Sequence, residues 1–113
     1  MKKVLVIAPH PDDETLGCGG TILKHRKNKD EVNWCIITLG NKDMGHDENH
    51  MNLWKNIILK TQKQFGIKRV FKLGYPTGGL DQVPLFKLVN SIKNVIKKNN
   101  PETVYINFSH DIH

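Results

Sequence analysis

Apolar residues recur along the chain in two periods, one typical of buried strands and the other of amphipathic helices. The run Lys3 to Ala8 (KVLVIA) is almost continuously aliphatic and β-branched, as in a strand that is buried on both faces. Three more segments of similar composition also predict strands: Glu31 to Thr38, Arg69 to Leu73 and Glu102 to Phe108.

Segments with helical periodicity lie between these strands: Thr15 to Lys27, Asn52 to Phe65 and Leu85 to Asn99. The third is the clearest, because one of its faces is entirely apolar: Leu85, Leu88, Val89, Ile92, Val95 and Ile96. The second has a comparable face that consists of Leu53, Ile57, Ile58, Thr61 and Phe65. Two stretches rich in polar residues, glycine or proline predict loops: Leu39 to Asn49 and Gly74 to Pro84.

The order of these elements indicates an α/β fold. Strands that alternate with helices predict right-handed crossovers and a parallel sheet with helices on both faces, here Rossmann-like and with four strands. At 113 residues and 12.9 kDa the chain is long enough for one domain, which we place at residues 1–113. Ligands of such sheets bind outside the carboxyl ends of the strands, so the residues that follow strands are the informative ones.

Composition narrows the class of protein and its surroundings. Hydrophobic residues make up 38% and charged residues 25%, as in a globular domain. No apolar run approaches the roughly 20 residues of a membrane span, and the run Val4 to Ala8 is too short for the core of a signal peptide. Cys18 and Cys35 form neither a disulfide framework nor a C-x-x-C pair. We therefore expect a cytoplasmic protein without a membrane span.

The net charge of +6 raises the question of a nucleic-acid partner. Only Arg26 and Arg69 are arginines, whereas arginine carries most bidentate recognition of phosphates and bases. The lysines are also spread along the chain. The sequence therefore favours a solvated basic surface and no nucleic-acid partner.

The first candidate site follows the first strand. His10-Pro11-Asp12-Asp13-Glu14 places an imidazole and three carboxylates within five residues. Imidazole and carboxylate suit zinc and similar divalent ions, and a neighbouring carboxylate can take a proton from water. The alternative is a helix-capping turn, in which Asp12 or Asp13 is the N-cap and Glu14 lies in the first turn. Both interpretations stay open at this stage.

The glycines that follow do not form a nucleotide-binding motif. In Gly17-Cys18-Gly19-Gly20 the third glycine of G-x-G-x-x-G is missing, because Ile22 occupies its position. Glycine costs a helix interior roughly 1 kcal/mol relative to alanine. The cluster therefore indicates either close packing of the helix on the sheet or close approach of a ligand.

The second candidate site follows the fourth strand. In Ser109-His110-Asp111-Ile112-His113 one histidine precedes the aspartate and a second follows it. It could supply a third metal ligand or an imidazolium that stabilises negative charge, or it could be a frayed polar terminus.

Together the two segments resemble the PIG-L/LmbE-like zinc-dependent N-deacetylases. The likeness extends through Leu16 to Thr21, Thr38-Leu39-Gly40, Gly74-Tyr75-Pro76 and Leu80-Asp81, in the family's order. It implies a Rossmann-like fold and a hydrolase that removes acetyl groups from N-acetylglucosamine-type conjugates, with zinc-bound water and an aspartate general base. The substrate would be a small N-acetylated sugar conjugate, and the cofactor would be Zn²⁺ or another divalent metal.

The resemblance also implies roles for single residues. His10 and Asp13 match the family's metal ligands, and Asp12 matches its general base. The carboxyl-terminal segment fits the family motif in two ways. Either His113 is the third metal ligand, or His110-Asp111-Ile112-His113 leads into H-D-I-H-x-D-H, so that His113 stabilises the oxyanion and the ligand lies three residues further on. The second alignment matches better, because Ile112 stands where the first requires aspartate. We expect catalytic roles for Asp12 and His113.

One departure concerns the second helix, where family members often carry an R-x-x-E pair and this chain has Trp54 and Ile57. Substrate-binding residues are therefore not assigned. Under the family interpretation the chain is the amino-terminal portion of a longer enzyme. We then expect an incomplete metal site, an exposed sheet edge and a tendency to form homo-oligomers.

Other polar residues have simpler explanations. The acidic and histidine residues between Asp43 and His50 are typical of a solvated loop. His25 is expected at the surface near a helix end, and Trp34 and Trp54 are expected in the core. The competing classes are a non-catalytic Rossmann-like nucleotide-binding module, a basic nucleic-acid-binding domain and an inactive fragment of the deacetylase.

Overall fold

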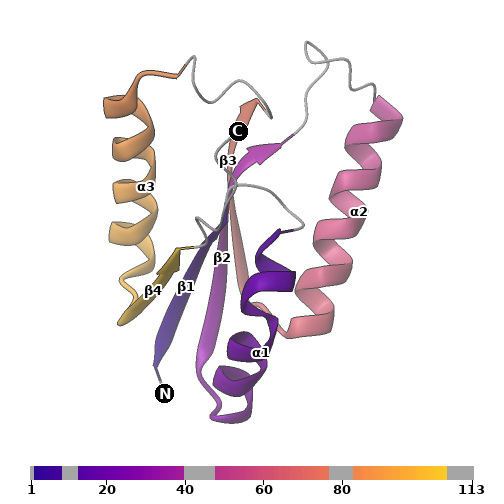
Figure 1. Cartoon of the computed structure of the whole chain (residues 1–113), viewed down its shortest axis with the longest axis vertical. Helices are drawn as coiled ribbons and strands as arrows, with labels where there is room; N and C mark the ends of the chain where they lie inside the picture. The colour runs from indigo at the N-terminus through magenta and orange to yellow at the C-terminus, as the bar shows by residue number, and fades with distance from the viewer. Residues whose placement is uncertain (1, 9–12, 40–47, 77–82, 107–113) are drawn as a thin grey trace.

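Strands and helices alternate along the chain, as Figure 1 shows for this computed structural model. The structure describes residues 2–8, 13–39, 48–76 and 83–106. The strands are β1 (Lys3–Ala8), β2 (Glu31–Leu39), β3 (Arg69–Pro76) and β4 (Thr103–Ile106). The helices are α1 (Asp13–Lys27), α2 (Glu48–Phe65) and α3 (Leu85–Asn99).

The four strands form one parallel sheet in the order β3-β2-β1-β4. Helices α1 and α2 cover one face and α3 covers the other (Figure 1). This confirms the predicted α/β fold with its Rossmann-like alternation. The strand order reverses at β1, because β2 and β3 follow on one side of it and β4 returns to the other.

The two faces of the sheet divide the core into two clusters. Side chains at alternate positions of β1 point to opposite faces, as the pleat of a strand requires. Val4, Val6 and Ala8 pack with Ile22 of α1 and Ile58 of α2, whereas Leu5 and Ile7 pack with Val95 of α3. In β2 every residue from Glu31 to Thr38 is buried, including Trp34, which confirms its expected place in the core. The central strands are therefore covered on both sides.

The strand β3 runs three residues past its predicted end. The pairing of β2 with β3 shifts between Ile36 and Thr38, so that Leu73 and Gly74 together face one residue of β2. Gly74 has φ +77°, a conformation in which glycine lacks the steric penalty of other residues. The glycine that predicted a loop is thus part of a β-bulge, and the strand continues to Pro76.

The helices begin earlier than predicted in two cases. Helix α1 starts at Asp13 instead of Thr15, and α2 starts at Glu48, within the predicted loop. Helix α3 matches its predicted bounds and ends as expected, since Asn100 adopts the left-handed conformation and donates its backbone N–H to the carbonyl of Ile96 over 2.7 Å. Strand β4 begins one residue later than predicted, at Thr103, and residues 107 and 108 of its predicted range lie outside the described residues.

The predicted apolar faces are correct in the middle of the helices and wrong at their first described turns. Ile58 and Val95 are buried, but Leu53 of α2 is 55% exposed and Leu85 of α3 is 74% exposed. Val89 is also exposed, and Trp54 is only half-buried. These first turns extend beyond the central strands, so the helical period continues where the sheet no longer covers it.

His25 lies in the last turn of α1, as expected, but its side chain is half-buried in a hydrogen-bonded chain instead of lying at the surface. Its Nδ1 lies 2.8 Å from Oδ2 of Asp30, and its Nε2 lies 3.0 Å from the hydroxyl of Tyr105. An ionised carboxylate only accepts, so Nδ1–H donates to Asp30, and Nε2 shares the second hydrogen bond with the tyrosine hydroxyl. The second oxygen of Asp30 accepts the backbone N–H of Lys2 over 3.0 Å. The chain of bonds joins α1, the start of β2 and β4.

A second polar cluster lies at the same edge of the sheet. Glu31 accepts from the side-chain amide of Asn33 over 2.9 Å and from the Lys68 ammonium over 3.2 Å. Oδ1 of Asn33 accepts the backbone N–H of Arg69 over 3.0 Å. Hydrogen bonds from His25 and Lys2 lower the pKa of Asp30, and the bond from Asn33 does the same for Glu31 against the opposing effect of desolvation. Both carboxylates therefore stabilise the fold in their ionised form.

These shifts predict how stability depends on pH. A carboxyl group with a lowered folded-state pKa stabilises the protein above its unfolded pKa of about 4 and loses that contribution as the pH falls through the folded value. We expect Asp30→Asn to lower the free energy of unfolding at pH 7, with a difference from the wild type that shrinks as the pH falls below about 4. Urea unfolding between pH 3 and 8 measures it, and Glu102→Gln, which removes an exposed carboxylate, is the control. A difference that stays constant across this range would contradict the role of the ionised Asp30.

Candidate functional site

The strand order reverses at β1, which makes the carboxyl ends of β1 and β4 neighbours. These strands are parallel neighbours, with Ile7 opposite Ile106, so the chain leaves both at the same level of the sheet. Crossovers on either side of such a point lead to opposite faces and open a crevice at the carboxyl ends, where ligands of open α/β sheets bind. The two candidate segments, residues 10–14 and 109–113, follow these two strands. The topology thus makes neighbours of the two strand ends that these segments follow in the sequence.

The side chains of the predicted site are not described individually. His10, Asp12 and His113 lie outside the described residues, and for Asp13 only the backbone is described, as the first residue of α1. The roles that we predicted for these residues remain predictions. The backbone does establish that the first segment joins the end of β1 at Ala8 to the start of α1 by four residues, 9–12.

The amino-terminus of α1 points its first turn toward this edge of the sheet. Unpaired backbone N–H groups and the helix dipole create a positive potential there, which stabilises carboxylates and anions. Because α1 begins at Asp13, this residue lies in the first turn and not before it.

The glycines of α1 face different surroundings. A Cβ added to Gly19 would lie 3.6 Å from the ring of Phe65 in α2, which is ordinary van der Waals contact, and one added to Gly20 would meet nothing within 4 Å. Neither position contacts the sheet closely. The expectation that these two glycines permit close helix–sheet packing is therefore wrong, and Gly19 instead lies where α1 meets α2.

The carboxyl ends of β2 and β3 lie at the same edge of the sheet, because all the strands are parallel. Residues 40–47 and 77–82, which include the acidic and histidine residues of the predicted solvated loop and Asp81, lie outside the described residues. Tyr75 is described, and its hydroxyl lies 2.6 Å from Oγ of Ser91 in α3. This tyrosine therefore braces β3 against α3.

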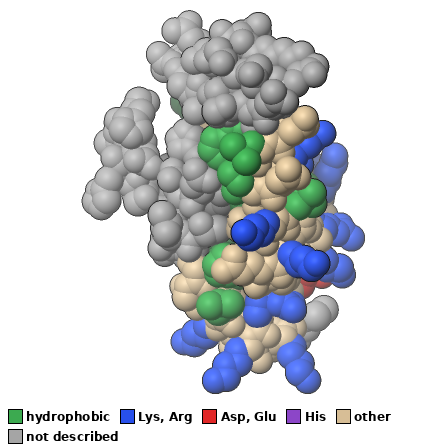
Figure 2. Space-filling model, turned by 90° about the vertical axis from the view of Figure 1, so that its right-hand side faces the viewer, with side chains coloured by type: hydrophobic (Ala, Val, Ile, Leu, Met, Phe, Trp, Pro, Cys, Tyr) green, Lys and Arg blue, Asp and Glu red, His purple; other side chains and the backbone are tan. Residues whose placement is uncertain are grey.

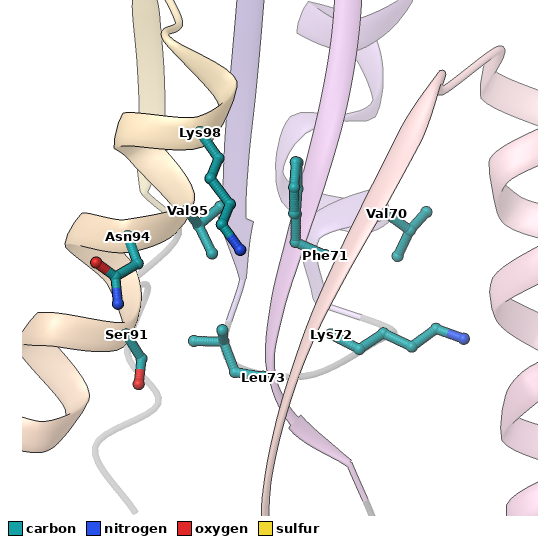
Figure 3. A pocket seen from close by; sticks show the side chains of 8 residues that line it. All are labelled: Val70, Phe71, Lys72, Leu73, Ser91, Asn94, Val95 and Lys98. Carbon is teal, nitrogen blue, oxygen red and sulfur yellow. The ribbon is translucent and has the colours of Figure 1, made fainter.

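The described cavities lie away from this edge. One cavity of about 430 Å³ lies between β3 and α3 (Figure 3). Another of about 310 Å³ lies near the amino-terminal edge of the sheet. It is lined by Asp30 and Glu31, whose carboxylate oxygens are already hydrogen-bonded. Within residues 2–8, 13–39, 48–76 and 83–106 no group of three or more His, Cys, Asp or Glu side chains could hold a metal ion. A metal centre would therefore have to draw on residues outside this described part of the chain, which include those of the two candidate segments.

Sequence reasoning missed the hydrogen-bonded chain of His25, Asp30 and Tyr105. A signal was present, since a histidine near a helix end and an aspartate five residues later can meet across the turn between a helix and a strand. The partner Tyr105 is 80 residues away, and only the tertiary fold brings it there. Asp30 and Lys2 directly precede β2 and β1, so the chain lies near the amino-terminal edge and serves the fold rather than the predicted site.

The other titratable side chains of the described residues do not indicate a second catalytic or metal-binding site. Burial raises the pKa of the Cys35 thiol to about 11, which keeps it protonated and unreactive at neutral pH. Lysine and arginine side chains spread over the side of the molecule that α2 forms (Figure 2). In the described part of the chain no helix is long and apolar enough to cross a membrane.

Comparison with known proteins identifies the family. Residues 5–113 match the family model described as PIG-L, GlcNAc-PI de-N-acetylase. Diacetylchitobiose deacetylase of Thermococcus kodakarensis is 30% identical over 111 residues, which cover 92% of this chain and 40% of that protein. A probable N-acetyl-alpha-D-glucosaminyl L-malate deacetylase 2 of Bacillus cereus is 28% identical over 120 residues, which cover 99% of this chain and 54% of that protein.

A solved structure shows the same fold. The N,N'-diacetylchitobiose deacetylase of Pyrococcus horikoshii, solved with an inhibitor, superposes with a TM-score of 0.76 at 27% identity. The alignment covers 91% of this chain and 39% of that one, so the chain spans about two-fifths to one-half of the relatives it matches. The family match includes both candidate segments and the strands that carry them. The chain therefore belongs to the PIG-L family of GlcNAc-PI de-N-acetylases.

Proposed function

We propose that this chain carries the catalytic residues of a hydrolase that removes an acetyl group from an N-acetylglucosamine-type conjugate. The observation that supports it most is the coincidence of topology and family: the two segments that match the family motif follow neighbouring strands at the reversal of strand order. The relatives include deacetylases of diacetylchitobiose and, probably, of an N-acetylglucosaminyl malate. The shared element of these names is an N-acetylated glucosamine unit.

A divalent metal, which we propose to be zinc, suits this donor set. His10 and Asp13 offer an imidazole and a carboxylate, the ligands that zinc takes in catalytic sites. The third ligand is a histidine of the segment after β4 or of its continuation. When bound, the metal supplies a nucleophile at neutral pH, because it lowers the pKa of water toward about 7.

The remaining chemistry falls to side chains of this chain. Asp12 accepts a proton from the attacking water as the oxygen of that water adds to the carbon of the acetyl carbonyl. His113 donates a hydrogen bond to the carbonyl oxygen as negative charge develops there. Asp12, or a neighbouring histidine, then returns the proton to the amine as the carbon–nitrogen bond breaks, so that acetate and a free amine leave.

The family match favours this function over the alternatives that the sequence left open. A nucleotide-binding module would use the glycines of α1 at a phosphate, but the third glycine of the fingerprint is absent. A fragment without activity would retain His10, Asp12 and Asp13 and lack the third ligand. The experiments below therefore use the full-length protein that contains this chain.

The general base can be tested by removing its charge alone. We expect Asp12→Asn to bind zinc as the wild type does and to lose activity by about 10²- to 10⁴-fold, because the amide cannot accept the proton. Acetate release from N,N'-diacetylchitobiose gives the rate, and elemental analysis gives the zinc content. Activity equal to that of the wild type would show that Asp12 is not the base.

Substitution of a metal ligand and substitution of the histidine that stabilises the oxyanion should differ in their effect on the amount of bound zinc. We expect His10→Ala to lose bound zinc together with activity. His113→Ala should keep zinc and lose about 10²- to 10³-fold in kcat, as happens when one oxyanion donor is removed. His25→Gln, in the hydrogen-bonded chain at the other end of the sheet, is the matched histidine control and should keep both. Loss of zinc in His113→Ala would instead make this residue a metal ligand.

A further inference from the structure

The strands of the sheet do not all end at one level on the carboxyl side. Ala8, the last residue of β1, pairs with Ile36, whereas β2 continues to Leu39 and pairs there with Pro76 of β3. At about 3.3 Å per residue, the paired ends of β2 and β3 project about 10 Å beyond the end of β1 (Figure 1). We call these ends, residues 37–39 and 73–76, the β2–β3 wall.

The β2–β3 wall stands beside the proposed catalytic edge. Strand β2 is the neighbour of β1, and β3 lies two strand spacings, about 10 Å, from β1. Under the proposed function the reacting carbonyl lies near the end of β1, where the first candidate segment begins. The β3 side of the wall is therefore placed for contact with parts of the conjugate away from that carbonyl.

A β-bulge shapes the β3 side of the wall. Leu73 and Gly74 together face one residue of β2, so that Tyr75 pairs with Thr38 instead of the residue that follows it. Bulges bend a strand and are frequent next to active sites, where they re-aim a side chain. The side chain that directly follows this bulge is Tyr75.

Tyr75 ties the wall to α3. Its hydroxyl lies 2.6 Å from Oγ of Ser91, and Ser91 in turn donates to the backbone carbonyl of Lys87 over 3.0 Å. The tyrosine side chain is half-buried and packs with the core cluster under α3. The cavity of about 430 Å³ between β3 and α3 reaches this bond, since Ser91 and Leu73 both line it (Figure 3). Because the cavity interrupts the packing of β3 on α3, the hydroxyl pair fixes the distance between the wall and the helix.

We propose that Tyr75 is a positioning residue for substrate binding: through Ser91 it holds the β2–β3 wall where the wall contacts the N-acetylglucosamine-type conjugate. This inference rests on the proposed function and adds to it a residue that does not touch the reacting atoms. Loss of one hydrogen bond between neutral groups shifts the population of the held wall by about three- to tenfold. The wall contacts the conjugate equally before and during the reaction, so this loss raises KM and leaves kcat unchanged.

Removal of the tyrosine hydroxyl tests the proposal. In the full-length protein we expect Tyr75→Phe to raise KM for N,N'-diacetylchitobiose by about three- to tenfold, with kcat within about twofold of the wild type. Tyr105→Phe is the matched control, because it also removes the hydroxyl of a half-buried, hydrogen-bonded tyrosine, but near the amino-terminal edge of the sheet. It should leave KM and kcat unchanged. Steady-state acetate release measures both constants. An unchanged KM in Tyr75→Phe, or an equal rise in both variants, would overturn the proposal.

Variants of Ser91 test whether the tyrosine acts through this bond. Ser91→Ala should raise KM as Tyr75→Phe does, and the double variant should raise it no further, because both substitutions remove the same bond. Ser91→Thr keeps a hydroxyl and should retain the KM of the wild type. Effects that multiply in the double variant would show that Tyr75 does not act through Ser91.

A measurement without substrate distinguishes failure of this inference from failure of the proposed function. Hydrogen exchange of the backbone amides of residues 70–75, followed by mass spectrometry, should be faster in Tyr75→Phe and unchanged in Tyr105→Phe, because only the first variant releases the wall. Unchanged exchange in Tyr75→Phe would overturn the brace whether or not the protein is active. A wild type that releases no acetate would contradict the proposed function and this inference with it. An active wild type whose KM is unaffected by Tyr75→Phe would overturn this inference alone.

Discussion

The structure depends on the burial of two strands on both faces. Every described side chain of β2 from Glu31 to Thr38 is buried, as are the residues of β1 from Val4 to Ala8. A strand with no exposed face needs helices above and below it, and it needs paired neighbours on both sides because its backbone groups have no access to water. The order β3-β2-β1-β4 meets both needs, with the two short or partly exposed strands at the ends. A sheet built outward in both directions from β1 must reverse its strand order there.

The same burial explains what the sequence could predict. A fully apolar run such as VLVIA identifies a central strand, and the regular stripe of α3 identifies its helix to the residue. Prediction from the sequence pattern was less accurate where the conformation depends on tertiary contacts and not on neighbouring residues in the sequence. Gly74 predicts a loop in isolation, but pairing with β2 makes it a bulge. Leu85 continues the period of α3 but is 74% exposed, because the period gives the face of a helix and not the extent of the sheet beneath it.

Prediction of the candidate site shows a similar division. Placing His10, Asp12, Asp13 and His113 after two strands required only local patterns, and the topology makes these strands neighbours. The family was also recognisable, because its first motif is compact and contiguous in the sequence. The bond between His25 and Tyr105 could not be predicted, since it joins residues 80 positions apart whose separate surroundings carry no common signal.

The pairing of β1 with β4 has a consequence for the order in which the protein folds. Val4 pairs with Val32 of β2, which is close to it in the sequence, and with Thr103 of β4, which is far from it. The second pairing can form only after almost all the described residues have been synthesised. Contacts of such long sequence separation form slowly, because the loop-closure entropy must be overcome first. During synthesis β1, β2 and β3 can already associate with α1 and α2 while one edge of β1 stays open. The carboxyl ends of β1 and β4 therefore become neighbours only after β1, β2 and β3 can have associated with α1 and α2.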